Sequence, residues 1–173
     1  RASVGASSVQ RRRMRKRDGT CAPQPSGITH QSSPDTPAGF VADPYYAQAA
    51  NNAAAPAGYT AMFTNLNASN SANQYMGYTL LPSYDVQSCA SKCSAITGCN
   101  SVNIYFERDP TVNPDDSSCS NPASTTQIKC VYWSGPVTND NANNAGQWRN
   151  KFQVVIAGSN GYVNKSIATP DGY

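Results

Sequence analysis

Residues 84–107 read YDVQSCASKCSAITGCNSVNIYFE, and they carry the strongest structural pattern in the chain. Asp85 is a favoured helix N-cap, and Gly98 is typical of the position just after a helix, so we predict a helix between them. Cys89 and Cys93 are four residues apart, which places both sulfurs on one side of that helix. We expect this side to be buried.

Strand patterns lie on both sides of the helix. In Ser101–Glu107 apolar and polar residues alternate, which is typical of a strand buried on one face. We also predict strands at Tyr75–Leu81, at Ile128–Trp133 and from Phe152 to Ile156, and we expect the glycines of 158–161 to end the last one. A helix whose cysteines face several short strands is an α+β arrangement.

The N-terminal part contains an arm and a second helix. Residues 20–41 are rich in Pro, Ser and Thr and predict an extended arm. Asp43 and Pro44 are an N-cap and a first helical residue, so we predict a helix over about 44–55. Its weak apolar pattern favours a position across a surface. The Asn- and Ser-rich residues 64–74 predict a loop.

The six cysteines indicate an oxidising compartment. Their even number and wide spacing favour disulfides, and no C-x-x-C pair is present. His30, the only histidine, lies in the arm, so we predict neither a metal site nor a cofactor. No apolar run approaches the roughly 20 residues of a membrane span. We therefore predict a secreted protein of the extracellular space or cell wall.

Charge is distributed unevenly along the chain. The first 17 residues hold seven of the 13 basic residues and no acidic residue, whereas the other 156 hold six basic and ten acidic residues. The folded part is therefore acidic, with a net charge near −4. Such a domain repels phosphate backbones, so we do not expect nucleic acid as a partner.

The basic segment 1–17 has three interpretations. It could bind anionic surfaces, it could direct nuclear import, or it could be a propeptide removed at Lys16-Arg17, which resembles a kexin-type dibasic site. The cysteines argue against the nucleus, and we favour a disordered, cleavable leader. Asn67 and Asn164 each begin a glycosylation sequon in a predicted loop.

Catalysis has weaker support in the sequence. A Ser–His–Asp site would need His30, and a glycoside hydrolase could take its carboxylates from Glu107, Asp109, Asp115 or Asp116. We favour an ion-pair cluster around Glu107, Arg108 and Asp109. Asn113, Asp115 and Asp116 could hold Ca²⁺, but their spacing does not match an EF-hand loop. We therefore do not predict an enzyme.

Five segments resemble known proteins. Three of them together resemble a PAN/apple domain: Tyr84-Asp85-x-x-x-Cys89-Ala90-x-x-Cys93, Gly98-Cys99-x-x-Val102-x-Ile104-Tyr105, and Ile128-Lys129-Cys130-Val131-Tyr132. Two others resemble a group of secreted ascomycete fungal proteins that contain such a module: Phe106-Glu107-Arg108-Asp109-Pro110 and Val155-Ile156-Ala157-Gly158-Ser159-Asn160-Gly161-Tyr162.

The resemblance implies a helix packed on a small antiparallel sheet and a division of the chain. We expect a Pro/Ala/Asn-rich extension at 18–70, a PAN/apple-like domain at 71–158, and at 159–173 a linker or the start of a further region. The resemblance also implies three disulfides, namely Cys89–Cys130, Cys93–Cys99 and Cys21–Cys119. A Cys119–Cys130 pair is an alternative.

The aromatic and charged residues near the predicted sheet are the candidate ligand contacts: Tyr105, Glu107, Arg108, Tyr132, Trp133, Trp148 and Arg149. Several of them could instead serve the core. The resemblance implies a non-catalytic module that recognises an extracellular glycan or protein. The alternatives are a self-associating structural component of the cell wall and a secreted fungal effector released by kexin-type cleavage.

Overall fold

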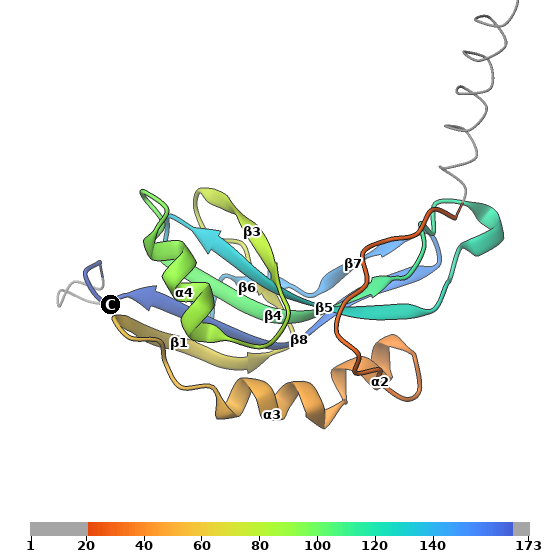
Figure 1. Cartoon of the computed structure of the whole chain (residues 1–173), viewed down its shortest axis with the longest axis horizontal. Coiled ribbons are helices and arrows are strands. Elements are labelled where there is room, and N and C mark those ends of the chain that lie inside the picture. The colour runs from red at the N-terminus through yellow and green to blue at the C-terminus, as the bar shows by residue number, and fades with distance from the viewer. Residues whose placement is uncertain (1–20, 168–173) are drawn as a thin grey trace, which may run out of the picture.

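A computed structural model describes residues 21–167, and the Lys16-Arg17 site lies outside this part of the chain. Its centre is an antiparallel sheet in the order β1-β8-β4-β5-β3, with β7 paired to β8 (Figure 1). These strands are β1 (Tyr59–Leu66), β3 (Tyr75–Leu81), β4 (Ser101–Pro110), β5 (Ser124–Trp133), β7 (Gly146–Arg149) and β8 (Phe152–Asn164). A separate pair is formed by β2 (Ser69–Asn70) and β6 (Ala142–Asn144). The helices are α2 (Pro37–Val41), α3 (Pro44–Asn52), α4 (Val86–Ser94) and the 3₁₀ turn η1 (Ser117–Cys119).

Helix α4 forms where the sequence predicts it. The carboxylate of Asp85 accepts a hydrogen bond from the Ser88 N–H at 2.9 Å, and Cys89 and Cys93 are fully buried against the sheet. The helix ends at Ser94, short of Gly98. A helix continued through Cys99 would separate it from Cys93 by about 9 Å, whereas their disulfide holds the two Cα atoms 5.3 Å apart.

Strand β4 is buried on both faces, which corrects the expectation of a half-buried strand. On one face Val102, Ile104 and Phe106 pack in a core with α3 and α4. On the other face Tyr105 packs in a second, smaller core. Apolar and polar residues do alternate in this strand. The polar side chains of Asn103 and Tyr105 are nevertheless buried, so the second face is covered as well.

Strand β8 runs through Gly158–Gly161, where we expected it to end. Gly158 has φ +58°, and the pairing with β4 shifts register between Ile104 and Phe106, so the residues form a bulge rather than a strand end. A Cβ on Gly161 would lie 2.3 Å from the Phe63 ring. A side chain at this position would displace the Phe63 ring.

The N-terminal segment belongs to the same folded unit. The Ile28 N–H donates to the Thr126 carbonyl at 2.8 Å, so the arm runs along β5 as well as being tied at Cys21 (Figure 1). Strand β1 pairs with β8, and β8 extends to Asn164. The boundaries expected near 70 and 158 therefore do not divide the sheet.

Helix α3 contributes to the core, although its weak apolar pattern suggested a surface position. Asp43 caps it by accepting from the Tyr45 N–H at 2.9 Å. Tyr46 and Ala50 are fully buried where the helix runs beside β1 and β8 (Figure 1). Tyr46 is the large side chain that anchors this alanine-rich helix in the core.

All six cysteines are paired, as Cys21–Cys119, Cys89–Cys130 and Cys93–Cys99. These are the pairs that the resemblance implies, and the alternative Cys119–Cys130 pair is not formed. Disulfides persist in oxidising surroundings, so three of them are compatible with an extracellular protein. Within residues 21–167, each helix is too short or too polar to span a bilayer.

Candidate binding groove

A groove lies on the sheet face opposite α4. Cys130 is bonded to α4, so the alternation of β5 turns Lys129, Val131 and Trp133 to the other face. Two adjoining hollows open there and share Tyr78 and Lys129. Their volumes are about 270 and 240 Å³, which suits one short stretch of a linear ligand rather than an enclosed small molecule.

The first of the two, here called the amide hollow, has aromatic walls and a polar lining. Tyr75 and Tyr78 of β3 are 57% and 52% exposed, and the ring of Tyr75 meets the Trp133 indole edge-on with 5.4 Å between centroids. The remaining lining consists mostly of small polar and amide side chains: Ser69, Asn70, Ser71, Asn103 and Asn144, together with Tyr105 and Val131.

The second, the charged hollow, contains an ion pair. Lys129 Nζ lies 2.8 Å from Glu107 Oε1 and 4.9 Å from the centre of the Tyr78 ring. Burial alone would lower the pKa of Lys129, but the Glu107 carboxylate more than compensates and raises it. The rest of the lining includes Gln24, Pro25, Leu80, Asp109, Gln127, Gln147 and Arg149.

Asp109 has the most perturbed carboxyl in this groove. Burial raises its pKa to about 9, and the charge and hydrogen bonding of Glu107 act in the same direction. Asp109 is therefore protonated at neutral pH and can donate a hydrogen bond. Burial of an ionisable group costs stability. A carboxyl with a strongly shifted pKa in a surface hollow is therefore typical of functional sites.

The carboxyl groups of Glu107 and Asp109 are not arranged as in a glycoside hydrolase. Such enzymes separate their two carboxyls by about 5 Å or more so that the sugar or a water fits between them. Glu107 and Asp109 are instead hydrogen bonded to one another, and Lys129 neutralises Glu107. The expected ion-pair cluster therefore exists, but with Lys129 in place of Arg108.

Four of the seven candidate contacts line the groove: Tyr105, Glu107, Trp133 and Arg149. Three do not, and strand alternation explains each of them. Tyr132 points to the α4 side and bonds Thr79 at 2.6 Å. In β7 Gln147 and Arg149 line the charged hollow. Trp148 lies between them in the strand, so its side chain points to the opposite side, where it is 64% exposed.

Arg108 is a structural residue rather than a ligand contact. Its side chain is 3% exposed, stacks over the Phe152 ring at 4.3 Å and bonds Asp35 at 3.2 Å. Burial alone would raise the pKa of Asp35, but hydrogen bonds from Ser124 and the Arg108 charge lower it. Arg108 thus ties the arm to the sheet.

Sequence reasoning missed Tyr75, Tyr78 and Lys129 as groove residues. Strict alternation would place Tyr75 and Tyr78, three residues apart, on opposite faces. Gly77 has φ +98°, and the pairing of β3 with β5 shifts register between the two tyrosines, which brings them into the same hollow. The glycine within this strand was the one available signal.

His30 does not form a serine-hydrolase site. Its Nε2 lies 2.7 Å from Asp43 Oδ2, and its ring stacks on Tyr45 at 3.8 Å between centroids. The hydroxyl of Ser32 donates to the same Asp43 oxygen at 2.7 Å, so Ser32 is bonded to the acid and not activated by the imidazole. Although burial would raise the pKa of Asp43, the bonds from His30 and Ser32 lower it.

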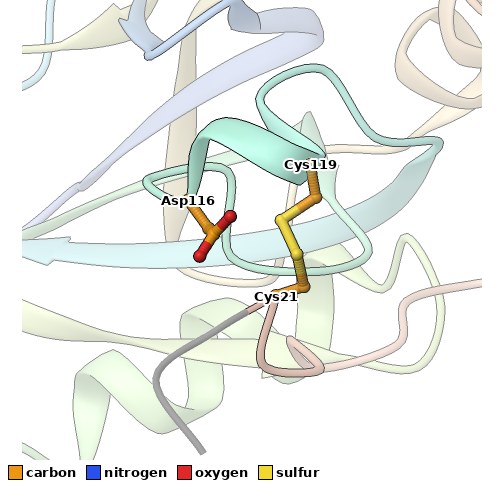
Figure 2. A group of neighbouring side chains, drawn as sticks. All are labelled: Cys21, Asp116 and Cys119. Atoms are coloured by element: carbon orange, nitrogen blue, oxygen red, sulfur yellow. A yellow bond between two sulfur atoms is a disulfide. The ribbon is translucent and has the colours of Figure 1, made fainter. Parts of the chain in front are cut away.

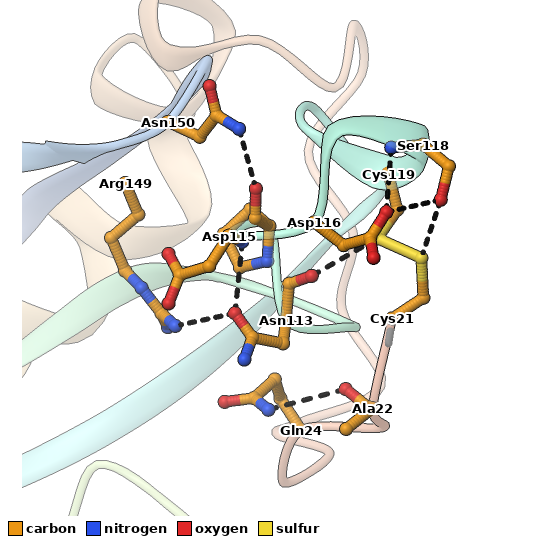
Figure 3. The surroundings of a disulfide bond; sticks show 11 residues. Cys21, Ala22, Gln24, Asn113, Asp115, Asp116, Ser118, Cys119, Arg149 and Asn150 are labelled. Atoms are coloured by element: carbon orange, nitrogen blue, oxygen red, sulfur yellow. Dashed lines mark hydrogen bonds between the residues drawn. A yellow bond between two sulfur atoms is a disulfide. The ribbon is translucent and has the colours of Figure 1, made fainter. Parts of the chain in front are cut away.

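Cys21, Asp116 and Cys119 lie close together but do not make a metal site (Figure 2). The two sulfurs are bonded to each other, and a disulfide offers no thiolate. Asp116 Oδ1 accepts from the Ser118 N–H at 2.8 Å and caps η1. In Figure 3 Asp115 points toward Arg149 while Asp116 points toward Ser118, so the two carboxylates do not converge on a Ca²⁺ position.

The two sequons differ in their surroundings. Asn67 is exposed directly after β1. Asn164 is half-buried at the end of β8, and its Oδ1 accepts from the Ser166 N–H at 3.0 Å. Glycosylation of both stays a prediction, with Asn67 the more accessible acceptor.

The fold and the groove define a disulfide-stapled α+β domain with an open, aromatic- and amide-lined sheet face. Comparison with protein-family models, with curated proteins and with solved structures finds no match.

Proposed function

We propose that the protein is a secreted, non-catalytic binding module and that the groove opposite α4 holds an extracellular glycan. The observation that carries this proposal is the pair of half-exposed rings, Tyr75 and Tyr78, beside the exposed polar side chains of Ser71 and Asn144. Aromatic rings cover the apolar faces of sugars, and amides bond their hydroxyls. The PAN/apple resemblance and the three disulfides are in keeping with such a role.

The shape of the groove favours a glycan over a small metabolite. Both hollows are open and adjoin through Tyr78 and Lys129, so an extended chain can pass from one to the other. The ion pair of Glu107 and Lys129 lies at the junction and offers both an acceptor and a donor to a neutral, hydroxyl-rich ligand.

We expect Tyr78→Ala to weaken retention on the polysaccharide that the wild-type protein binds by tenfold or more, since hot-spot aromatics contribute over about 1.4 kcal/mol. The measurement is depletion from solution by insoluble chitin, β-glucan and mannan. Trp148→Ala is the matched control, because Trp148 is also more than half exposed but lies outside both hollows. Failure of the wild type to bind any of the three, or equal loss in both variants, would refute the assignment.

Self-association is the second candidate, and β3 supports it. This strand is an edge of the sheet, and Tyr75, Tyr78 and Leu80 expose large apolar groups on it. No charged residue occurs between 71 and 84, whereas edge strands are commonly protected by charge. Gly77 distorts the edge and works against long pairing. For that reason we place glycan binding first.

A further inference from the structure

Two buried polar atoms that belong to residues lining the amide hollow lack hydrogen-bond partners. Among residues 21–167 three buried side-chain polar atoms make no hydrogen bond: Asn70 Oδ1, Trp133 Nε1 and Arg108 Nε. The first two belong to residues that line this hollow, and these residues are 5% and 9% exposed. Buried polar groups are almost always satisfied, so an unpaired donor and an unpaired acceptor beside one hollow indicate a missing partner.

The surroundings hold both groups in place. The Asn70 N–H donates to Asn103 Oδ1 at 3.0 Å, and its side-chain Nδ2 donates to Asn141 Oδ1 at 2.6 Å and to the Thr138 carbonyl at 3.0 Å. The amide therefore cannot turn its oxygen toward another partner without losing two bonds. The Trp133 indole packs in the second core with Phe63 and Val137 and against Tyr75.

The chemistry of the two atoms specifies a complementary group. The indole N–H needs an acceptor, and Asn70 Oδ1 needs a donor. A secondary amide has both, a carbonyl oxygen and an N–H that point in opposite directions on one small planar unit, so it can bridge a donor on one side and an acceptor on the other. An ammonium group has no lone pair to accept from the indole N–H. A ring hydroxyl offers a donor and an acceptor, but both on a single oxygen atom, so it cannot bridge two separated groups as well as an amide can.

We propose that the amide hollow recognises the acetamido group of an N-acetylated sugar, with its carbonyl accepting from Trp133 Nε1 and its N–H donating to Asn70 Oδ1. This assignment rests on the proposed function and names the ligand class for the same groove. The half-exposed Tyr75 ring, which packs on the indole, is placed to cover the face of the sugar that carries this group. A site built for an amide rejects analogues that leave these groups unpaired.

The decisive experiment compares three β-1,4-linked hexasaccharides by calorimetry on the full chain: the N-acetylglucosamine hexamer, its de-N-acetylated form and the glucose hexamer. We expect the N-acetylated hexamer to bind at least tenfold more tightly than the other two. Trp133→Phe removes the N–H but keeps an aromatic ring, and it should reduce this preference about tenfold. Trp148→Phe should leave it unchanged.

An independent readout needs no variant. The chain contains two tryptophans, so two indole N–H signals are expected in NMR spectra. The Trp133 signal should move downfield when the N-acetylated hexamer binds, since its N–H gains an acceptor, while the exposed Trp148 signal stays in place. This readout decides the matter if Trp133→Phe fails to fold.

The outcomes separate the two proposals. Equal binding of all three hexamers, or an unchanged preference in Trp133→Phe, would overturn acetamido recognition and leave glycan binding intact. Binding of an N-acetylated peptide amide without binding of the sugars would overturn it in favour of a peptide ligand. Failure to bind any polysaccharide would overturn the proposed function itself.

Discussion

Replacement of both Cys89 and Cys130 by Ala is expected to lower the free energy of unfolding by about 4 kcal/mol. The bridge closes 41 residues, and loop-closure entropy gives this value for a loop of that length. Both sulfurs are fully buried between α4 and β5, so their loss also removes packing atoms from the core. Urea denaturation at neutral pH measures the effect.

The pair Cys93 and Cys99 provides the matched control. Its bridge closes only six residues, so the same relation gives about 2 kcal/mol for the double alanine variant. We expect loss of the Cys89–Cys130 bridge to lower the free energy of unfolding more than loss of the Cys93–Cys99 bridge. A larger loss from the short bridge, or equal losses from both, would contradict this order.

The second large effect concerns Asp109. Its pKa is near 9 in the folded protein, against 3.8 for an unperturbed aspartate. Between these values the folded state holds a proton that the unfolded state has released, so stability falls as pH rises. At pH 7 the cost reaches about 4 kcal/mol, at about 1.4 kcal/mol per pH unit.

Asp109→Asn should therefore stabilise the protein, since an amide stays neutral in both states and still donates a hydrogen bond to Glu107. The gain should be near zero at pH 4 and should increase toward pH 8, which thermal melts across this range can follow. Asp140→Asn changes an exposed carboxyl and serves as the control. A variant that is less stable than the wild type at every pH would contradict the assignment.

Much of the scaffold could be predicted from local chemistry. Asp43 and Asp85 both cap helices through their side chains, and the strand at Tyr75–Leu81 has the predicted bounds. Strand β1 could not be predicted, because its exposed and buried positions do not alternate and it is defined by its pairing with β8. The sheet is therefore wider than local patterns indicate.

Two glycines explain most of what sequence reasoning missed in the sheet. Gly158 forms a bulge that lets β8 continue, and Gly77 brings Tyr75 and Tyr78 to one face. Both depend on register with a neighbouring strand, which the sequence does not display. The groove residues Tyr105, Glu107, Trp133 and Arg149 were predictable by type, whereas Arg108, Tyr132 and Trp148 alternate with groove residues along their strands and point away from the groove.

The measurement that tests the central claim most directly is hydrogen–deuterium exchange of the full chain with and without a bound cell-wall oligosaccharide. We predict slower exchange in peptides that cover residues 69–81 and 144–149, which include β2, β3 and β7 beside the groove. Peptides of α3 and α4, on the other face, should exchange as before. Protection confined to the helices would show that the ligand binds elsewhere and would contradict the account.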